Sequence, residues 1–279
     1  MTRSIRAQKW GIYGCLWVMV VISLYPVVVM LMGSVKTYGE LTSNPLGWPL
    51  HPTLKNFTAL FHYNGGLIVR TYINGIVIAV VSTTLTVFVS AMAGYAFAKY
   101  KFKGSKILFT ALLVTMMVPQ QLELPSLYLL FAKLHWLNTF QVQIVPIIAS
   151  VFTMFMIRQF MFNIPDSLIE ASRLDGAGHW YTFTRIILPI SRPVLGAMFI
   201  LTFLSVWNSY LWPLTMVDSP TKMPIMVILP TLNSSANQFF IEWPTVMAGC
   251  VIVTVPLMLV FLIFQKQFMN SVTIGAVKE

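Results

Sequence analysis

The sequence predicts an all-α polytopic membrane protein with six transmembrane helices and both termini in the cytoplasm. Of its 279 residues, 57% are hydrophobic and only 9% are charged, whereas a soluble domain carries about 25% charged residues. Six stretches contain no Lys, Arg, Asp or Glu, and they approach the roughly 20 apolar residues that span a bilayer. A cytosolic enzyme and a soluble nucleic-acid-binding domain are therefore excluded, in spite of the net charge of +10.

The spans are expected within one domain, residues 1–279, at about residues 10–34, 71–97, 107–122, 140–158, 193–213 and 244–265. The first resembles a signal peptide because basic residues precede it. It is too long for that and shows no small-x-small cleavage site, so it is predicted to be a retained anchor. The third is the weakest span, because Pro119, Glu123 and Pro125 interrupt its outer end.

A further uncharged stretch, residues 223–241, is not predicted to span the bilayer. It contains Pro224, Pro230 and a polar cluster that starts at Asn233. Unpaired backbone groups at such breaks are costly in hydrocarbon. The stretch is therefore predicted to be an external loop. Two alternatives remain for its local structure, a short helix and a re-entrant segment.

The distribution of Lys and Arg gives the orientation. With the N-terminus inside, thirteen of the eighteen basic residues fall on inner segments and five on outer ones. The positive-inside rule then places both termini in the cytoplasm. It also makes two inner segments prominent, the short basic loop 99–104 and the long loop 158–192.

The long loop is predicted to contain two short helices. Ser167 and Glu170 have capping-box spacing, with Asp166 and Asn163 as alternative caps. The first helix is expected to run to about Asp175 and to end at Gly176 in the left-handed conformation. The second, residues 179–187, is expected to end at Pro189. On helix signals alone, a connector lying at the membrane interface explains this loop.

The order of residues in the loop indicates more than a connector. The loop resembles the EAA loop of ABC importer permeases. It contains Glu170-Ala171-Ser172, then Gly176 after three residues, then Ile186-x-Leu188-Pro189 after nine more. That pattern is E-A-A-x3-G-x9-I-x-L-P, from which only Ser172 departs.

Other segments resemble the carbohydrate branch of these permeases. They are 95–104 (Y-A-F-A-K-Y-K-F-K-G), Met117 to Tyr128, Trp207 to Pro213, and the C-terminal end, where Ser271 and Glu279 depart from frequent glycines. The chain thus resembles a MalG-like permease of a binding-protein-dependent carbohydrate ABC importer over nearly its whole length.

The resemblance implies a type I ABC importer permease fold in the bacterial inner membrane. It implies four kinds of partner: an ATPase dimer, a second MalF-like permease, an extracytoplasmic solute-binding protein and a sugar. The residues expected to couple to the ATPase are Asp166, Glu170, Ala171, Ser172, Arg173, Asp175, Gly176 and Ala177. The cytoplasmic tail 266–279 either inserts between ATPase subunits or is a frayed end.

The substrate path is expected among intramembrane polar and aromatic groups. The candidates are Glu123, Asn208, Tyr210 and Trp212. Helix–helix hydrogen bonding and interfacial anchoring are the alternative roles for these residue types.

No catalytic group, cofactor or metal is expected on this chain. It has no G-x-x-x-x-G-K-[ST] loop for ATP phosphates, and its four His residues are scattered. ATP and Mg²⁺ are therefore assigned to the partner ATPase. The alternatives are a permease for glycerol phosphate, an amino acid or a peptide, and a stand-alone secondary transporter, which usually places ionisable residues within its spans.

Overall fold

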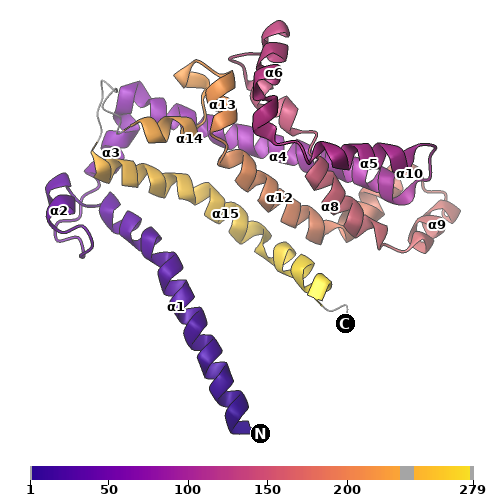
Figure 1. The fold of residues 1–279 in the computed structure, drawn as a ribbon, viewed down its shortest axis with the longest axis horizontal. Helices are drawn as coiled ribbons and strands as arrows, with labels where there is room; N and C mark the ends of the chain where they lie inside the picture. Colours follow the sequence, from indigo (N-terminus) through magenta and orange to yellow (C-terminus); the bar gives the residue numbers. More distant parts are fainter. Residues whose placement is uncertain (1, 233–241, 277–279) are drawn as a thin grey trace. The chain divides into compact units, whose positions relative to one another are not determined.

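The computed structural model describes the backbone of residues 2–232 and 242–276, and the side chains of residues 10–232 and 242–267. Within these ranges the secondary structure is helical, with no strand (Figure 1). The elements are α1 (Thr2–Ser34), α2 (Tyr38–Ser43), α3 (Lys55–His62), η1 (Tyr63–Gly66), α4 (Leu67–Lys99), α5 (Ser105–Thr115), α6 (Gln120–Lys133), α7 (Phe140–Ile144), η2 (Val145–Ile147), α8 (Val151–Phe162), α9 (Asp166–Leu174), α10 (His179–Tyr181), η3 (Thr182–Ile187), α11 (Leu188–Ile190), α12 (Arg192–Trp207), α13 (Leu211–Met216), η4 (Pro220–Lys222), α14 (Ile225–Ile228), η5 (Leu229–Thr231) and α15 (Trp243–Ala276).

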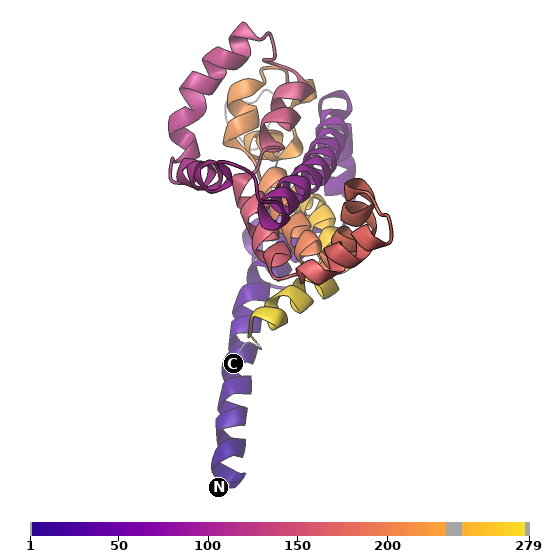
Figure 2. The same ribbon diagram turned by 90° about the vertical axis from the view of Figure 1, so that its right-hand side faces the viewer.

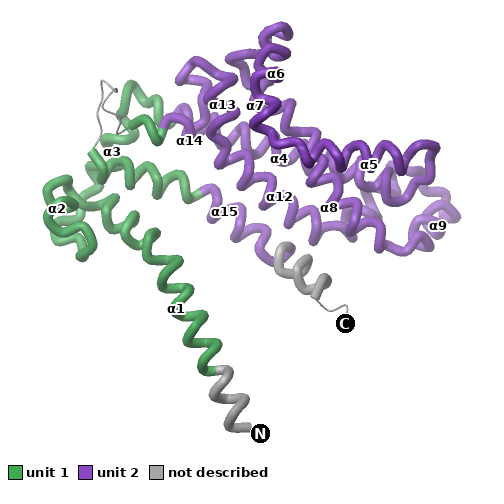
Figure 3. The backbone as a smooth tube through the Cα atoms, in the orientation of Figure 1, with its two compact units in different colours: residues 1–69, 229–255 green, residues 70–228, 256–279 purple. Residues whose placement is uncertain are grey.

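The chain forms two compact units, coloured separately in Figure 3. Unit 1 contains residues 1–69 and 229–255, and unit 2 contains residues 70–228 and 256–279. The candidate coupling loop and all four substrate-path candidates belong to unit 2.

Unit 1 contains a folded loop between α1 and α3 that is organised around a buried lysine. Lys36, just after α1, is fully buried, and its Nζ donates to the backbone oxygens of Asn44 (2.7 Å), Gly47 (2.6 Å) and Pro45 (3.4 Å). The Asn56 amide donates to the carbonyl of Lys36 at 2.8 Å. Three carbonyl acceptors thus satisfy the three donors of the ammonium group, as burial of a charge requires.

Four helical stretches are long and apolar enough to cross a bilayer, and two bent pairs raise that number to as many as six among the described residues. The four are Trp10–Ser34, Lys55–Lys99, Phe140–Phe162 and Trp243–Gln267. The bent pairs are α5 with α6, which meet at 99°, and residues 179–190 with α12, which meet at 78°. Figure 2 shows the sharp turn between α5 and α6.

Two predicted spans are divided in the structure. The run 107–122 is split because α5 ends at Thr115 and Pro119 occupies the N-cap of α6, while Pro125 is accommodated inside α6. The run 193–213 is split because α12 ends at Trp207, where the Asn208 amide donates to the carbonyl of Leu204 at 2.9 Å. The backbone N–H of Asn208 donates to the same carbonyl at 3.1 Å, so residue 208 caps the helix end with two donors.

The remaining boundaries concern the outer loop and the tail. Residues 220–231 of the predicted outer loop form η4, α14 and η5, and residues 233–241 lie outside the described residues. Helix α15 continues to Ala276, so most of the predicted tail 266–279 is helical.

The larger apolar core of unit 2 joins the coupling loop to the candidate spans. It contains Val87, Ala91 and Tyr95 of α4, Ile157 and Met161 of α8, Ile164 before α9, Ile169 of α9, Phe183 and Ile187 of η3, and Val194 and Met198 of α12. The loop is thus packed against α4, α8 and α12, so a movement of the loop must also move these helices.

Helices α4 and α8 approach closely below this core. A Cβ atom at Gly94 would lie 3.1 Å from the backbone nitrogen of Arg158, so only a glycine fits without adjustment. The Arg158 guanidinium lies 4.1 Å from the centre of the Phe109 ring, and its Nε donates to the carbonyl of Phe97 at 3.3 Å. This arginine therefore links α4, α5 and α8.

Candidate functional site

The C-terminal end of α9 is closed by Gly176. Its backbone φ is +80°, its N–H donates to the carbonyl of Arg173 at 3.0 Å, and the N–H of Ala177 donates to the carbonyl of Ser172 at 2.9 Å. These two bonds form a Schellman motif, which satisfies carbonyls that the helix leaves free. The prediction that Gly176 ends this helix in the left-handed conformation is confirmed.

The N-terminal end of α9 differs from the prediction. Pro165 occupies the N-cap, and no side chain there accepts a backbone hydrogen bond, so the capping box of Ser167 with Glu170 is wrong. The alternative caps are used elsewhere: the Asn163 amide donates to the carbonyl of Gln159 at 2.9 Å, and Asp166 pairs with a lysine.

Lys99, the last residue of α4, holds the start of α9. Its Nζ lies 2.7 Å from Oδ1 of Asp166 and donates to the carbonyl of Ile164. The Lys99 side chain is only 4% exposed, whereas that of Asp166 is 75% exposed. The hydrogen bond and the positive charge of Lys99 lower the pKa of Asp166, which keeps the carboxylate ionised.

Ser172 ties α9 to the next helical segment. Its buried hydroxyl donates to the carbonyl of Ile169 at 2.8 Å and lies 3.0 Å from the hydroxyl of Thr182. The residue that departs from the E-A-A pattern thus has its own hydrogen-bond partner. Beside it, Ile169 is buried in the core of unit 2.

The opposite side of α9 forms an exposed surface, here called the docking face. It consists of Leu168, Glu170, Ala171, Arg173, Leu174 and Asp175. Leu174 is 89% exposed, which is unusual for so large an apolar side chain. Ile169 does not belong to this surface, because its side chain is buried in the core of unit 2.

The second helical segment passes through Pro189. Residues 182–187 form a π-helix, Pro189 lies in the first turn of α11, and the helix ends at Ile190. The helix thus ends one residue beyond the predicted end at Pro189. A proline is tolerated in the first turn of a helix, and the widened turn before it breaks the regular hydrogen-bond ladder.

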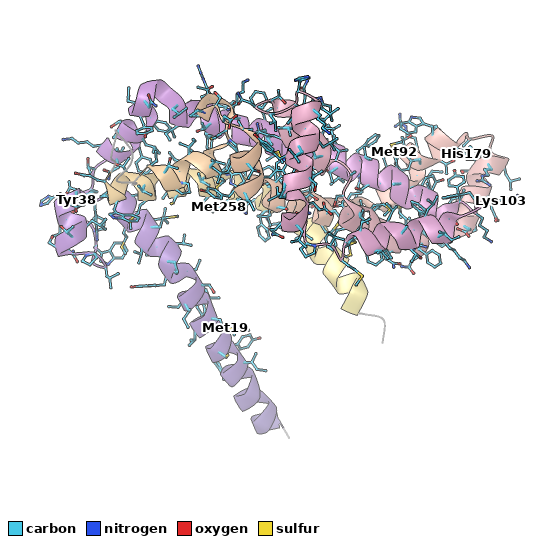
Figure 4. The ribbon with its side chains drawn as sticks, turned by 45° about the horizontal axis from the view of Figure 1, so that its top comes forward. Met19, Tyr38, Met92, Lys103, His179 and Met258 are labelled. Atoms are coloured by element: carbon cyan, nitrogen blue, oxygen red, sulfur yellow. The ribbon has the colours of Figure 1, made fainter. Side chains whose placement is uncertain are left out.

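The short basic loop 99–104 and the coupling loop lie at the same end of unit 2. Lys103 and His179 are labelled there in Figure 4. Nδ1 of His179 lies 2.8 Å from the hydroxyl of Tyr100. These contacts bring together the two inner segments that the charge count made prominent.

The substrate-path candidates lie on two neighbouring parts of unit 2. Asn208 and Tyr210 are exposed in the break between α12 and α13, and Glu123 is exposed in the first turn of α6. Trp212 is half-buried: its Nε1 donates to the carbonyl of Val142 at 2.9 Å, and its ring packs edge-on against Phe131 of α6. Trp212 therefore connects α13 to α6 and α7.

Gln143 of α7 is a polar residue of this region that the sequence did not single out. It is buried, and its Nε2 donates to the carbonyls of Lys222 (3.2 Å) and Thr139 (3.4 Å), while Oε1 has no partner among the described residues. It lines a cavity of about 20 Å³ together with Trp207, Ser209 and Trp212. That volume suits about one water molecule.

Three other residues that position the site were also missed. Lys99 was counted only toward topology, and Thr182 and Arg158 carry no signal of their partners in the sequence. No cluster of three or more His, Cys, Asp or Glu side chains able to hold a metal occurs in the described part of the chain.

Comparison with known proteins places this arrangement in a family. Residues 86–273 match the family described as "Binding-protein-dependent transport system inner membrane component". The chain is 34% identical over 257 residues to the arabinooligosaccharides transport system permease protein AraQ of Bacillus subtilis (strain 168), covering 91% of this chain and 90% of that protein. It is 31% identical over 268 residues to the lactose transport system permease protein LacG of Rhizobium radiobacter, covering 95% of each.

The fold also has a solved counterpart. A chain in the crystal structure of a bacterial ABC transporter involved in the import of the acidic polysaccharide alginate matches with a TM-score of 0.85 at 21% identity. The match covers 95% of this chain and 98% of that chain. Taken with the apolar helices, these similarities show that the chain belongs to the binding-protein-dependent transport system inner membrane components, the permease subunits of ABC importers.

Proposed function

We propose that this permease forms one half of the translocation pore of an importer for a sugar or oligosaccharide. The observation that carries the proposal is the docking face of α9, which is exposed on one side and fixed on the other. Relatives named for arabinooligosaccharides and lactose support the sugar class. A second, MalF-like permease supplies the other half, and an extracytoplasmic solute-binding protein delivers the sugar.

In the proposed topology each bent helix pair counts as one span. Six spans then place both termini in the cytoplasm of a bacterial inner membrane, as the positive-inside rule favours. The Lys99–Asp166 pair supports this arrangement because it joins the two inner loops on one side.

The docking face is proposed to sit in a groove on one subunit of a separate ATPase dimer. Glu170, Arg173 and Asp175 provide charged contacts, and Leu168 and Leu174 provide apolar ones. Because Ile169 and Ser172 anchor the same helix in the bundle, movement of the ATPase is transmitted as a rigid-body rotation of the permease. ATP and Mg²⁺ are bound by the ATPase, and this chain binds no cofactor.

The test is coupling in the assembled transporter. Gly176→Val or Gly176→Pro is expected to abolish sugar-stimulated ATP hydrolysis, while the permease stays inserted in the membrane. Gly178→Ala is the matched control, since Gly178 has ordinary extended backbone and open space around it. Normal coupled transport by the Gly176 variants, or reproducible failure of an ATPase to co-purify with the wild-type chain, would refute the proposal.

The substrate path and the tail have separate tests. If Asn208 contacts the sugar, Asn208→Ala lowers the uptake affinity, and an unchanged affinity removes Asn208 from the path. Deletion of residues 275–279 is expected to change ATPase activity if the tail inserts between the ATPase subunits. An unchanged activity identifies the tail as a frayed end.

A further inference from the structure

Unit 2 contains a second and larger cavity, which shares no lining residue with the first. Its volume is about 300 Å³, and α4, α12 and α15 line it. The side chains that matter to its chemistry are Val87, Arg192, Leu195, Phe199, Phe264 and Gln267. Measured in the same way, a cavity needs about 10–15 Å³ to hold one water, so this one has room for a molecular group of several atoms.

Polar and apolar ends of the cavity are separated along the helices. A Cβ atom at Gly196 would lie 2.6 Å from Cβ of Gln267, so α12 and α15 nearly touch at this level. One turn further on, the rings of Phe199 and Phe264 stack with their centres 4.7 Å apart. Phe199 lies seven residues, or about 10 Å, beyond Arg192 along α12. Arg192 and Gln267 thus mark one end, and phenylalanines form the other.

The polar end offers one cation and one free acceptor. Arg192 is exposed, and no carboxylate within the described side chains lies at ion-pair distance from it. Oε1 of Gln267 is shielded from solvent and has no partner among the described residues. A shielded acceptor without a donor is costly, which favours a ligand that brings one. The ligand must therefore combine an anion, a hydrogen-bond donor next to it and an apolar body.

We propose that this cavity binds one phosphatidylglycerol molecule of the cytoplasmic leaflet. Arg192 pairs with the phosphate, and a hydroxyl of the glycerol headgroup donates to Oε1 of Gln267. The start of an acyl chain lies along Val87, Phe199 and Phe264. Basic pockets between helices on the cytoplasmic side are suited to anionic headgroups. The headgroup ammonium of phosphatidylethanolamine fits less well, because it would lie next to the Arg192 guanidinium.

A sugar fits this cavity poorly, because Val87, Leu195, Phe199 and Phe264 offer no hydrogen bonds to its hydroxyls. The lipid assignment rests on the proposed topology, which places Arg192 at the cytoplasmic surface. It needs no assumption about which solute is transported.

Native mass spectrometry of the assembled transporter tests the site. The complex is purified in mild detergent and titrated with phosphatidylglycerol, with phosphatidylethanolamine and with phosphatidylcholine. The wild type is expected to retain one phosphatidylglycerol per copy of this chain in preference to the other two lipids. Arg192→Gln should weaken its retention about fivefold, the effect of losing one cationic contact worth about 1 kcal/mol. Val87→Phe, which fills the cavity without changing charge, should weaken it as well.

Arg185→Gln is the matched control, since Arg185 is an exposed arginine of the same cytoplasmic segment outside the cavity. Equal losses in Arg192→Gln and Arg185→Gln would reduce the effect to general surface charge and overturn the proposal. Equal retention of the three lipids by the wild type would also overturn it. The same spectra report the masses of the partner subunits. A mass that lacks the ATPase or the second permease would count against the proposed function. A complete complex that lacks phosphatidylglycerol would count only against the lipid site.

Discussion

The hydroxyl oxygens of Ser172 and Thr182 lie 3.0 Å apart in a buried contact between α9 and η3. The Thr182 hydroxyl also lies 3.2 Å from the carbonyl of Gly178, and the Ser172 hydroxyl lies 2.8 Å from that of Ile169. Since each hydroxyl has one proton, the bond between Ser172 and Thr182 forms when one of them donates to the other instead of to its carbonyl. The two helical pieces of the coupling loop are therefore held together by side chains as well as by the glycine turn.

Ser172→Ala should lower stability by about 1 kcal/mol, the net value of one buried hydrogen bond. Thr182 keeps its bond to Gly178, so folding and coupling should survive. Ser167→Ala is the control, because Ser167 is exposed and its predicted capping role is not seen. Thermal unfolding of both variants in detergent checks this. A larger loss in Ser167→Ala would mean that the capping box forms after all.

Gly176→Ala should cost about 1–2 kcal/mol, because a Cβ atom is strained at a φ of +80° even where space is open. Gly176→Asn should cost less, since asparagine tolerates this conformation better. Gly178→Ala, with a φ of −72°, should change stability by no more than about 0.5 kcal/mol. Unfolding midpoints of the three variants give the comparison, and equal midpoints would argue against backbone strain at Gly176.

Lys36→Met should destabilise the loop between α1 and α3 by about 2 kcal/mol or more, because it leaves the partly buried carbonyls of residues 44, 45 and 47 without their donor. Lys55→Met is the matched control, since Lys55 is exposed on α3. Limited proteolysis between α2 and α3 measures the effect. Cleavage that is equally fast in both variants would contradict the structural role of Lys36.

The Lys99–Asp166 pair should be insensitive to pH across the physiological range. The pKa of Asp166 is lowered in the folded chain, so its stabilising contribution is present above its ordinary value of 3.8 and is lost as the pH falls through the lower folded value. Hydrogen exchange of residues 163–176, corrected for intrinsic rates, should therefore show constant protection between about pH 5 and pH 8.

Asp166→Asn should raise that exchange at pH 7, because the ionic contact to Lys99 is lost. Asp175→Asn should leave the exchange near Pro165 unchanged, as this exposed carboxylate lies at the other end of α9. Protection that fades already between pH 7 and pH 5, or equal effects of the two substitutions, would show that the pair does not hold the helix.

Local signals in the sequence predicted much of this structure. The apolar runs located the candidate spans, and Gly176 followed by small residues predicted the end of α9. These features depend on residues close to each other in the chain. The EAA spacing also located the helix that carries the exposed charges, since its fixed positions lie within 20 residues.

Features that depend on distant residues were not predictable. Asp166 was offered as a cap, because nothing local to it indicates a lysine 67 residues earlier. Lys36 is one of the five basic residues that the charge count assigned to outer segments, and nothing near it in the sequence indicates that it is fully buried against backbone carbonyls. The break after Thr115 was indicated by Pro119, but the break at Trp207 lies in an uncharged run whose composition indicates no change in direction.

The π-helix of residues 182–187 has a consequence for the direction in which the docking face points. A π-turn holds one residue more than the corresponding α-helical turn, and each residue of an α-helix advances the azimuth by about 100°. Removing one residue from this stretch would restore regular winding and turn everything before it by that angle. The direction in which Glu170 and Leu174 point thus depends on the inserted residue of the π-helix. A deletion within residues 182–187 would leave the docking face folded but turn it away from its present direction.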